Sequence, residues 1–324
     1  MPHGVLGVRL QHGPRAHGPV SAVVGAIYTE DAPRVADVPN PCALCDEHLR
    51  RALFRVDGAL IVACLGCGLV RQETRPAATE AVYGSTYYTT DDPKGGYANY
   101  FLDAAVNRRT FRRRVLSLER RYGTRGRLLD IGAALGDLVL EATTAGWDAE
   151  GVELSAYAAA QARKRGAVVH AGPLASLGLP PATFDVVTLY DTLEHLADPI
   201  AVLAEARRLL RPGGLVHVIT PNASGLQAKV LGRRWYHYKP REHLFYFTPA
   251  TLRAATERAG LRWDGWARSP SYLTVTYIFN RLRYYAPRLF GALEWLGRTF
   301  RVGPFAFYLD VGEMEAWARK EADA

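Results

Sequence analysis

The sequence predicts an α/β protein built on a doubly wound, mostly parallel sheet that is preceded by a small cysteine-rich ribbon. The first observation is that short apolar strands alternate with helix-length segments, the strands being RLLDI, AEGVEL, AVVHA, FDVVTLY and GLVHVIT. Such alternation is typical of a parallel sheet with helices on both faces. The second observation is that all four cysteines lie upstream of these strands, in two Cys-x-x-Cys pairs.

The composition is that of an ordinary globular protein larger than one average domain, with 324 residues, 48% of them hydrophobic and 22% charged. No apolar run approaches the ~20 residues needed to span a bilayer. The formal net charge of +8 favours acidic partners such as nucleic acid, nucleotide sugars or anionic lipid surfaces without selecting one of them. The arginines between residues 107 and 127 are interpreted as a solvated helix face, with a ligand surface as the alternative.

Residues 1–37 carry scattered Gly, Pro, His and Arg without a period, and we expect them to form a disordered tail. Their apolar run from Val20 to Tyr28 is short and lacks a clear small-residue cleavage site, which argues against the alternative of a secretory signal. Four thiols at metal-binding spacing also fit a reducing compartment. We therefore expect a cytoplasmic protein.

Residues 38–76 are predicted to form a zinc ribbon. Cys42 and Cys45 are separated from Cys64 and Cys67 by eighteen residues, which is the spacing of a four-thiolate zinc site. Each Cys-x-x-Cys turn can present two sulfurs to one tetrahedral ion, and such a closed site is structural rather than catalytic. A redox pair, or thiols that have lost their metal, are the alternatives.

Residues 77–126 are predicted to be a helical connector, and residues 127–324 the main domain. The connector contains YGSTYYTTDDPKGGYANY, whose tyrosines either pack against the core or form a lid over a ligand. The main domain has an amphipathic insertion at about residues 271–308. A helix pair packed on the core is the simpler interpretation of this insertion, and contact with a lipid surface is the alternative.

The most informative segment is LLDIGAALGDL, from Leu128 to Leu138, in which a strand runs into a glycine-rich turn. Gly132 and Gly136 permit positive φ and let a ligand approach the main chain. The next strand, AEGVEL, carries Glu153 near its end, and this carboxylate can accept two hydrogen bonds from a ribose diol. The turn and the carboxylate together predict a nucleoside-binding site.

Asp130 discriminates between nucleoside cofactors. It lies two positions before the first glycine, where a carboxylate would repel the pyrophosphate of a dinucleotide but can attract the ammonium of a methionine-like ligand, directly or through water. S-adenosylmethionine (SAM) carries that ammonium and NAD does not. We therefore predict SAM as the cofactor, with a nucleotide-free turn whose glycines only serve packing as the alternative.

The chain resembles class I SAM-dependent methyltransferases over four successive motifs: LLDIGAALGDL, GVELS, FDVVTLYDTLEHLADP and LRPGGLVHVITPN. The resemblance implies a seven-stranded, Rossmann-like sheet whose last two strands, in WDGWAR and EMEAWAR, form an antiparallel edge. Ala134 departs from the family, which often has a further glycine there, and Pro173 and Leu174 stand where the family usually offers a polar group to adenine. The residues expected to hold SAM are Asp130, Gly132, Ala133, Gly136, Asp137, Glu153, Leu154, Leu174, Tyr190 and Asp191.

The segment after FDVVTLY should border the cofactor, because ligands of open α/β sheets bind beyond the carboxyl ends of the strands. Asp191 and His195 lie in this segment and would share one face if it were helical. Glu194 is expected to face solvent. For His195, a catalytic role and a packed, hydrogen-bonded histidine both remain open.

A second polar cluster follows the fifth strand, in RRWYHYKPREHLFYFTPATL. Methyl transfer to a hydroxyl or a carbon requires alignment of the acceptor and removal of a proton, for which histidine is suited. Glu242 and His243 also resemble a pair in sugar methyltransferases with an N-terminal four-cysteine zinc domain, some of which methylate a keto-sugar carbon. The resemblance implies His243 as the base, with Glu242 orienting it or facing water. A histidine that caps the next helix or anchors the loop is the alternative.

We predict a zinc-containing, SAM-dependent methyltransferase that acts on oxygen or carbon of a small polar acceptor. A sugar or another natural-product intermediate is the expected acceptor, with a nucleotide sugar among the candidates. One alternative is an RNA methyltransferase that holds nucleic acid with the ribbon and the basic surface. The other is a noncatalytic SAM-binding or assembly protein.

Overall fold

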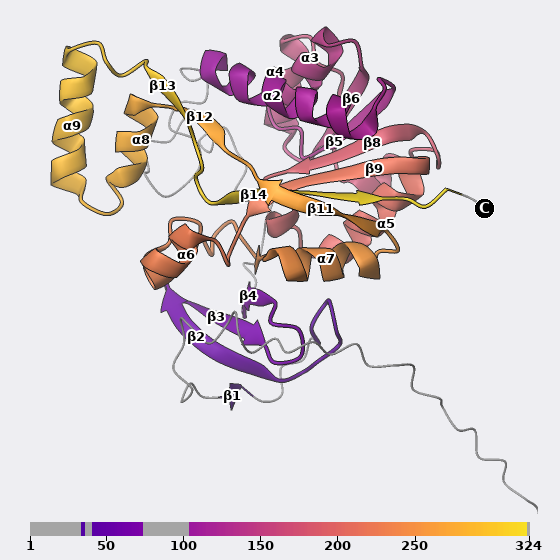
Figure 1. Ribbon diagram of the computed structural model, residues 1–324, viewed down its shortest axis with the longest axis horizontal. Helices are drawn as coiled ribbons and strands as arrows, with labels where there is room; N and C mark the ends of the chain where they lie inside the picture. Colours follow the sequence, from indigo (N-terminus) through magenta and orange to yellow (C-terminus); the bar gives the residue numbers. More distant parts are fainter. Residues whose placement is uncertain (1–33, 36–40, 74–103, 323–324) are drawn as a thin grey trace, which may run out of the picture.

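The computed structural model describes residues 34–35, 41–73 and 104–322 (Figure 1). The predicted tail, apart from Arg34 and Val35, and the tyrosine-rich stretch at residues 83–100 lie outside the described residues.

The main domain is built on a seven-stranded sheet in the order β11-β14-β9-β8-β5-β6-β7. Strands β9, β8, β5, β6 and β7 are parallel, and β14 is antiparallel to both β9 and β11. The predicted fold class and the antiparallel edge are therefore confirmed. The strands are β5 (Arg127–Ile131), β6 (Asp148–Glu153), β7 (Val169–Ala171), β8 (Phe184–Tyr190), β9 (Leu210–Pro221), β11 (Arg262–Arg268) and β14 (Glu313–Arg319).

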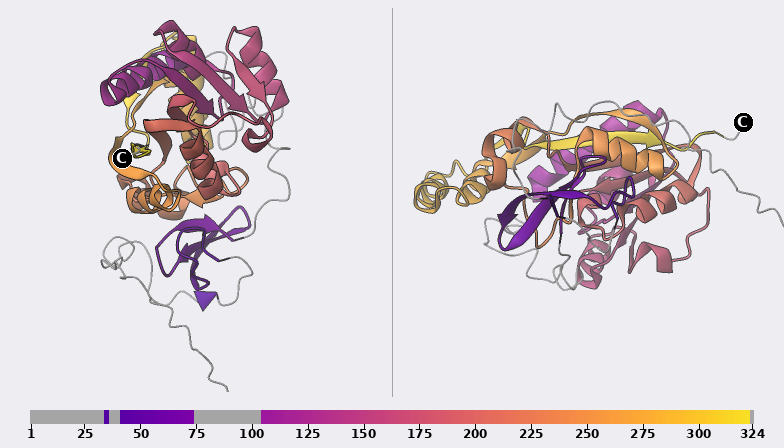
Figure 2. Two further views of the ribbon diagram at one scale, coloured as in Figure 1. Left: turned by 90° about the vertical axis from the view of Figure 1, so that its right-hand side faces the viewer. Right: turned by 90° about the horizontal axis from the view of Figure 1, so that it is seen from below.

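Helices cover both faces of this sheet, which is why all seven residues of β8 are buried (Figures 1 and 2). One face packs against α2, α3 and α4, and the other against α5 and α7. These helices are α2 (Ala104–Tyr122), α3 (Asp137–Thr144), α4 (Ala156–Lys164), α5 (Pro199–Leu209) and α7 (Pro249–Arg258). Most arginines of α2 are exposed as expected, but Arg114 turns inward and is buried.

The cysteine-rich ribbon forms a five-stranded antiparallel sheet in the order β1-β2-β3-β4-β10. Its strands are β1 (Arg34–Val35), β2 (Arg50–Val56), β3 (Ala59–Cys64), β4 (Val70–Gln72) and β10 (Phe245–Tyr246). Strand β10 comes from the main domain, where Phe245 pairs with Arg71 and Tyr246 with Val70. The ribbon is thus hydrogen-bonded to the chain directly after His243.

The insertion between β11 and β14 forms a two-stranded ribbon that carries a helix pair at its tip. Its elements are β12 (Ser271–Thr274), α8 (Val275–Leu282), α9 (Pro287–Thr299) and β13 (Ala306–Leu309), with β12 and β13 antiparallel. Helix α9 packs on α8 and lies at the end of the molecule away from the central sheet (Figures 1 and 2). We expected the helix pair to pack on the core. This holds only for the base of the insertion, where β12 contacts α2.

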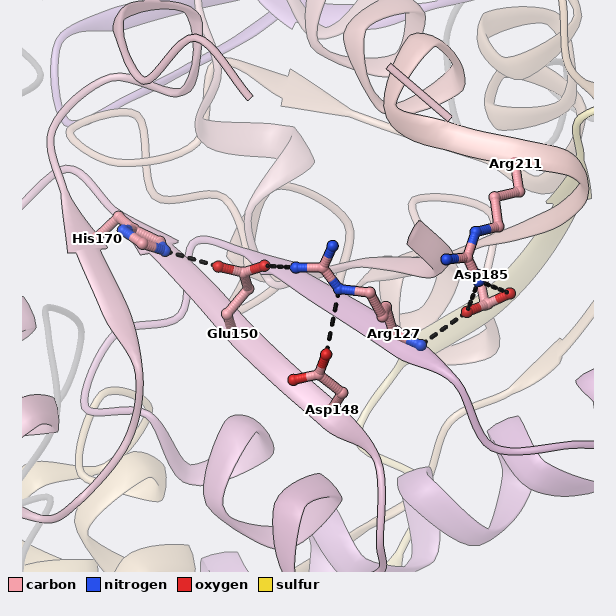
Figure 3. Close-up of polar contacts among 6 residues, drawn as sticks. All are labelled: Arg127, Asp148, Glu150, His170, Asp185 and Arg211. Atoms are coloured by element: carbon pink, nitrogen blue, oxygen red, sulfur yellow. Dashed lines mark hydrogen bonds and ion pairs between the residues drawn. The ribbon is translucent and has the colours of Figure 1, made fainter. Parts of the chain in front are cut away.

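Polar side chains link the amino-terminal ends of five parallel strands (Figure 3). The Arg127 guanidinium lies 2.9 Å from a Glu150 oxygen, while the other Glu150 oxygen is 2.7 Å from His170 Nε2. The backbone N–H of Arg127 donates to Asp185 at 2.7 Å, and Arg211 Nη1 donates to the same carboxylate at 2.8 Å. This network links the amino-terminal ends of the parallel strands, whereas the glycine-rich loop follows the carboxyl end of β5.

Candidate active site

The glycine-rich loop between β5 and α3 adopts the left-handed conformations that its sequence requires. The φ angles are 83° at Gly132 and 78° at Gly136, and Ala134 also has a positive φ of 46°. A Cβ at Gly132 would lie 2.2 Å from Thr192 Oγ1, so only glycine fits there. The positive φ of Ala134 also explains why the family often has a further glycine at this position, since alanine is strained in the left-handed conformation.

The N–H groups of this loop turn toward β6. Gly132 and Ala133 donate to the Val152 carbonyl at 2.8 and 3.0 Å, and Ala134 donates to Glu153 Oε2 at 2.8 Å. A pyrophosphate site needs such donors to point at the ligand. Because these three donors are engaged by the protein, the loop fits a ligand without phosphate, such as SAM.

The side chains expected around the nucleoside lie at the carboxyl ends of β6 and β7. Glu153 is buried and accepts a second hydrogen bond from the Ser155 N–H at 2.7 Å, while burial raises the pKa of its carboxyl. Leu154 beside it is exposed, and Leu174 follows β7 and packs at the margin of the core. A carboxylate flanked by two apolar side chains suits a ribose attached to a flat base.

Three other residues expected to hold SAM direct their side chains into the protein. Asp130 is buried and accepts a 2.7 Å hydrogen bond from Thr188, and burial raises the pKa of its carboxyl to about 7. Asp137 forms an ion pair with Arg165, and the Tyr190 hydroxyl lies 2.8 Å from His217 Nδ1. The carboxylate of Asp130 thus lies inside the sheet beneath the loop, and its role toward SAM stays a prediction.

A cavity of about 500 Å³ opens between α2, α8, β12 and α6 (Leu226–Leu231). Its wall is mainly apolar and includes Tyr236, Tyr277, Tyr285, Ile278 and Leu282. Its polar lining includes the pair Asp191 and Glu313 and the guanidinium of Arg114, which lies 3.4 Å from Glu313. Burial and the neighbouring charge of Asp191 raise the pKa of Glu313 to about 8. Asp191 has a φ of 49°, and such strained residues cluster at functional sites.

The histidines of the two predicted clusters meet next to this cavity. The ring centroids of His195 and His243 are 4.7 Å apart, and those of His237 and His243 are 6.2 Å apart. His237 lines the cavity, whereas His243 is buried behind it and its Nδ1 has no hydrogen-bond partner among the described residues. Burial, followed by the proximity of His195 and Lys239, holds the pKa of His243 well below its usual value. The lowered pKa favours the uncharged form of this imidazole.

The condition set for one expectation in this region is not met, and another expectation is wrong. The segment after β8 is a single turn of 3-10 helix at Leu193–His195, so Asp191 and His195 do not share a helix face. Asp191 lines the cavity while His195 packs on His243. Glu194 is buried rather than solvent-facing, because its carboxylate accepts a 2.8 Å hydrogen bond from Thr220 inside the sheet.

Glu242 is buried, and its backbone carbonyl accepts a 2.9 Å hydrogen bond from His195 Nδ1. Glu242 thus orients His195 through its main chain. Sequence reasoning missed Arg114, Glu313 and Arg281, which line the cavity, and Lys239 beside the histidines. Lys239 lies in the aromatic cluster that drew attention to His243, but Arg114 and Glu313 are 199 residues apart, and no spacing in the sequence connects them.

The four cysteine side chains converge in the ribbon, with all four Sγ atoms within 4.8 Å of one another. Cys42 and Cys67 have Sγ atoms 3.5 Å apart, as do Cys45 and Cys64, and none forms a disulfide. Sulfurs bound to one tetrahedral zinc lie about 3.8 Å apart, given a Zn–S distance of ≈ 2.3 Å. The donor set therefore fits Zn²⁺, and the zinc site itself stays a prediction.

A family model described as a methyltransferase domain matches residues 102–264, half of the 324 residues of the chain. The chain belongs to this methyltransferase family. It is a SAM-dependent methyltransferase, in agreement with the geometry of the loop and of Glu153.

Known relatives match part of the methyltransferase. A ubiquinone biosynthesis O-methyltransferase of Bordetella avium is 30% identical over 169 residues, which cover 48% of this chain and 69% of the relative. Its namesake from Methylococcus capsulatus is 37% identical over 103 residues, 30% of this chain and 44% of that relative. The solved structure of a SAM-dependent methyltransferase from Thermotoga maritima superimposes with a TM-score of 0.49 at 18% identity, over 75% of this chain and 100% of that one.

Proposed function

We propose that this methyltransferase transfers the methyl group of SAM to an oxygen or carbon of a hydroxylated small molecule, such as a sugar or another natural-product intermediate. The cavity beside Asp191 supports this proposal, because its volume of about 500 Å³ lies within the ≈ 300–1,000 Å³ of small-molecule sites. Its tyrosines can stack on a ring, and Asp191, Glu313 and Arg114 can bind hydroxyl groups.

The position of His243 is the observation that carries the mechanism: its ring stacks on His237 of the cavity wall, and its Nδ1 has no hydrogen-bond partner among the described residues. SAM, when bound, supplies an electrophilic methyl group on a sulfonium, and transfer is an in-line displacement that requires an aligned acceptor. Asp191 and the cavity wall would hold the acceptor. His243 would take the proton that the acceptor loses as it receives the methyl group. His237 lies between the cavity and His243 and can contact the acceptor or a bridging water.

Turnover of His243→Ala tests this role. We expect the variant to bind SAM with native affinity by calorimetry and to lose methyl transfer by about 10²-fold or more. The matched control is His170→Ala, on the edge strand β7, because this imidazole pairs with Glu150 and does not line the cavity; it should leave both quantities unchanged. Native turnover in His243→Ala would remove the histidine from the mechanism.

An assay of methyl transfer from labelled SAM also distinguishes this proposal from the two alternative functions. Salt-sensitive RNA binding with methylation of RNA would favour an RNA methyltransferase. SAM binding without transfer to any acceptor pool would favour a noncatalytic SAM-binding protein.

We also propose that Cys42, Cys45, Cys64 and Cys67 hold a structural Zn²⁺, and that the protein works in the reducing cytoplasm, where these free thiols stay available to the metal. No described helix is both long and apolar enough to cross a membrane.

A further inference from the structure

The outward face of α9 and the turn that follows it expose large apolar side chains. Phe300 is 71% exposed and Trp295 65%. Leu289 and Leu296 are also exposed, and because they precede Phe300 by eleven and four residues they lie on the same side of the helix. The exposed apolar side chains continue through Val302, Phe305, Phe307 and Leu309.

The inward face of α9 is mixed: Phe290 lies beside Phe279 of α8, their ring centroids 6.3 Å apart, and a charged residue is buried next to it. Glu294 is buried against α8, where it pairs with Arg298 at 2.7 Å and Arg283 at 3.6 Å. A helix on the surface of a water-soluble protein normally buries its apolar stripe and exposes its charges. Helix α9 packs part of its apolar surface on α8 but leaves its larger apolar side chains exposed, which indicates that its outer face contacts something apolar.

A second group of exposed apolar side chains lies across the cavity, on α6. Leu226 is 76% exposed and Val230 73%, and their four-residue spacing places them on one face. Gln227 and Leu231 of the same helix line the cavity, as does Leu309 at the end of β13. The apolar surfaces of α6 and β13 therefore flank the cavity, and α6 and α9 lie at the same end of the molecule (Figure 1).

Exposed arginines accompany these apolar groups. Arg288 and Arg301 are on or next to α9, and Arg233 and Arg234 directly follow α6. Tryptophan and phenylalanine combined with arginine are typical of surfaces that lie in the interface of an anionic bilayer. A second copy of the chain is a poorer occupant, because it would present the same arginines and the same net charge of +8.

We propose that α6, α9 and residues 300–309 form a docking face for an anionic lipid bilayer, and that the cavity lined by α6 and Leu309 receives an amphipathic acceptor whose polar head group is methylated. The docking face stands on its own observations, whereas the acceptor class rests on the proposed function. A hydroxylated head with an apolar carrier matches a cavity that combines Asp191, Glu313 and Arg114 with a mainly apolar wall.

Vesicle sedimentation tests the docking face. We expect the full-length, zinc-replete protein to sediment with vesicles of phosphatidylcholine and phosphatidylglycerol in equal parts but not with phosphatidylcholine alone. Binding should weaken as salt is raised. Trp295→Ala and Phe300→Ala should each lower the partition coefficient about tenfold, since each removes a large apolar side chain from the interface. Trp266→Ala, which removes an exposed tryptophan from the edge strand β11, should leave binding unchanged.

Equal vesicle binding by the native protein and by both α9 variants would overturn the docking face. So would a dimer in sedimentation velocity that the two variants dissociate, if it occurs without vesicle binding, because a second copy would then cover the face. SAM calorimetry of each variant shows that the fold is intact.

The acceptor is tested separately, with labelled SAM and two acceptor pools. We expect methylation of a lipid extract and not of aqueous metabolites. Vesicle binding together with methylation of aqueous metabolites alone would refute the amphipathic acceptor. SAM binding without methylation of either pool would instead count against the proposed function, so the two failures are distinguishable.

Discussion

Asp185→Asn should destabilise the protein through the polar network at the amino-terminal sheet edge (Figure 3). Asp185 accepts hydrogen bonds from the Arg127 N–H at 2.7 Å, the Tyr122 hydroxyl at 3.0 Å and Arg211 Nη1 at 2.8 Å. Its side chain is only 12% exposed. Asparagine keeps the shape but removes the charge, and it replaces one acceptor oxygen with an NH₂ group that faces other donors.

The cost can be worked out from these contacts. Hydrogen bonds to a charged group contribute about 1.5–3 kcal/mol, and a buried donor left without a partner costs about 1–3 kcal/mol. The pair with Arg211 adds less than about 1 kcal/mol, because that guanidinium is half exposed. We expect a loss of about 3 kcal/mol in the free energy of unfolding from urea titration, and a fall of roughly 6–12 °C in Tm by calorimetry.

Asp148→Asn is the matched control, because Asp148 pairs with the same Arg127 at 3.2 Å but is 77% exposed. It should change stability by less than about 0.5 kcal/mol. Equal losses in the two variants would refute the reasoning.

The effect of Asp185 should also depend on pH. Partial burial acts to raise the pKa of this carboxyl, but hydrogen bonds from Arg127, Tyr122 and Arg211 outweigh it, and the pKa is lowered. The stabilisation is therefore fully present above the unfolded pKa of about 3.9 and is lost as pH falls through the folded value. The difference between native protein and Asp185→Asn should shrink in acid. A difference that stays constant down to the acid limit would contradict a role for the charge.

Four further changes test the glycine-rich loop, the SAM site and the cysteine cluster. Ala134→Gly should raise the free energy of unfolding by about 1 kcal/mol, since glycine relieves the left-handed strain; a less stable variant in urea would contradict this. Glu153→Gln should weaken SAM binding about tenfold by calorimetry, through loss of a charged acceptor, and an unchanged Kd would remove Glu153 from the site. Because the pKa of Asp130 is raised to about 7, the Kd for SAM should rise as pH falls through that value, and Asp130→Asn should abolish the trend. Cys64→Ser should lower bound zinc, measured by elemental analysis, from one equivalent per chain; a native content would argue against the four-thiolate site.

Features that depend on a few neighbouring residues were predictable from the sequence. Gly132 and Gly136 predict a turn with left-handed backbone conformations, because only glycine adopts positive φ without strain. The fully buried strand β8 is readable as FDVVTLY because a strand covered on both faces has to be apolar throughout. The two Cys-x-x-Cys pairs likewise indicate their convergence, because a short turn fixes the distance between two thiols.

Features that depend on distant segments were decided only by the tertiary structure. Strand β10 joins the ribbon through two residues, too few for any periodicity, and Glu194 is buried because Thr220 of β9 supplies its hydrogen bond. Arg114 and Glu313 meet across 199 residues to line the cavity. Amphipathicity predicted that the insertion contains helices, but a periodic pattern has no direction in space. Only the packing of α9 on α8 showed that Glu294 faces inward while Trp295 and Phe300 face outward.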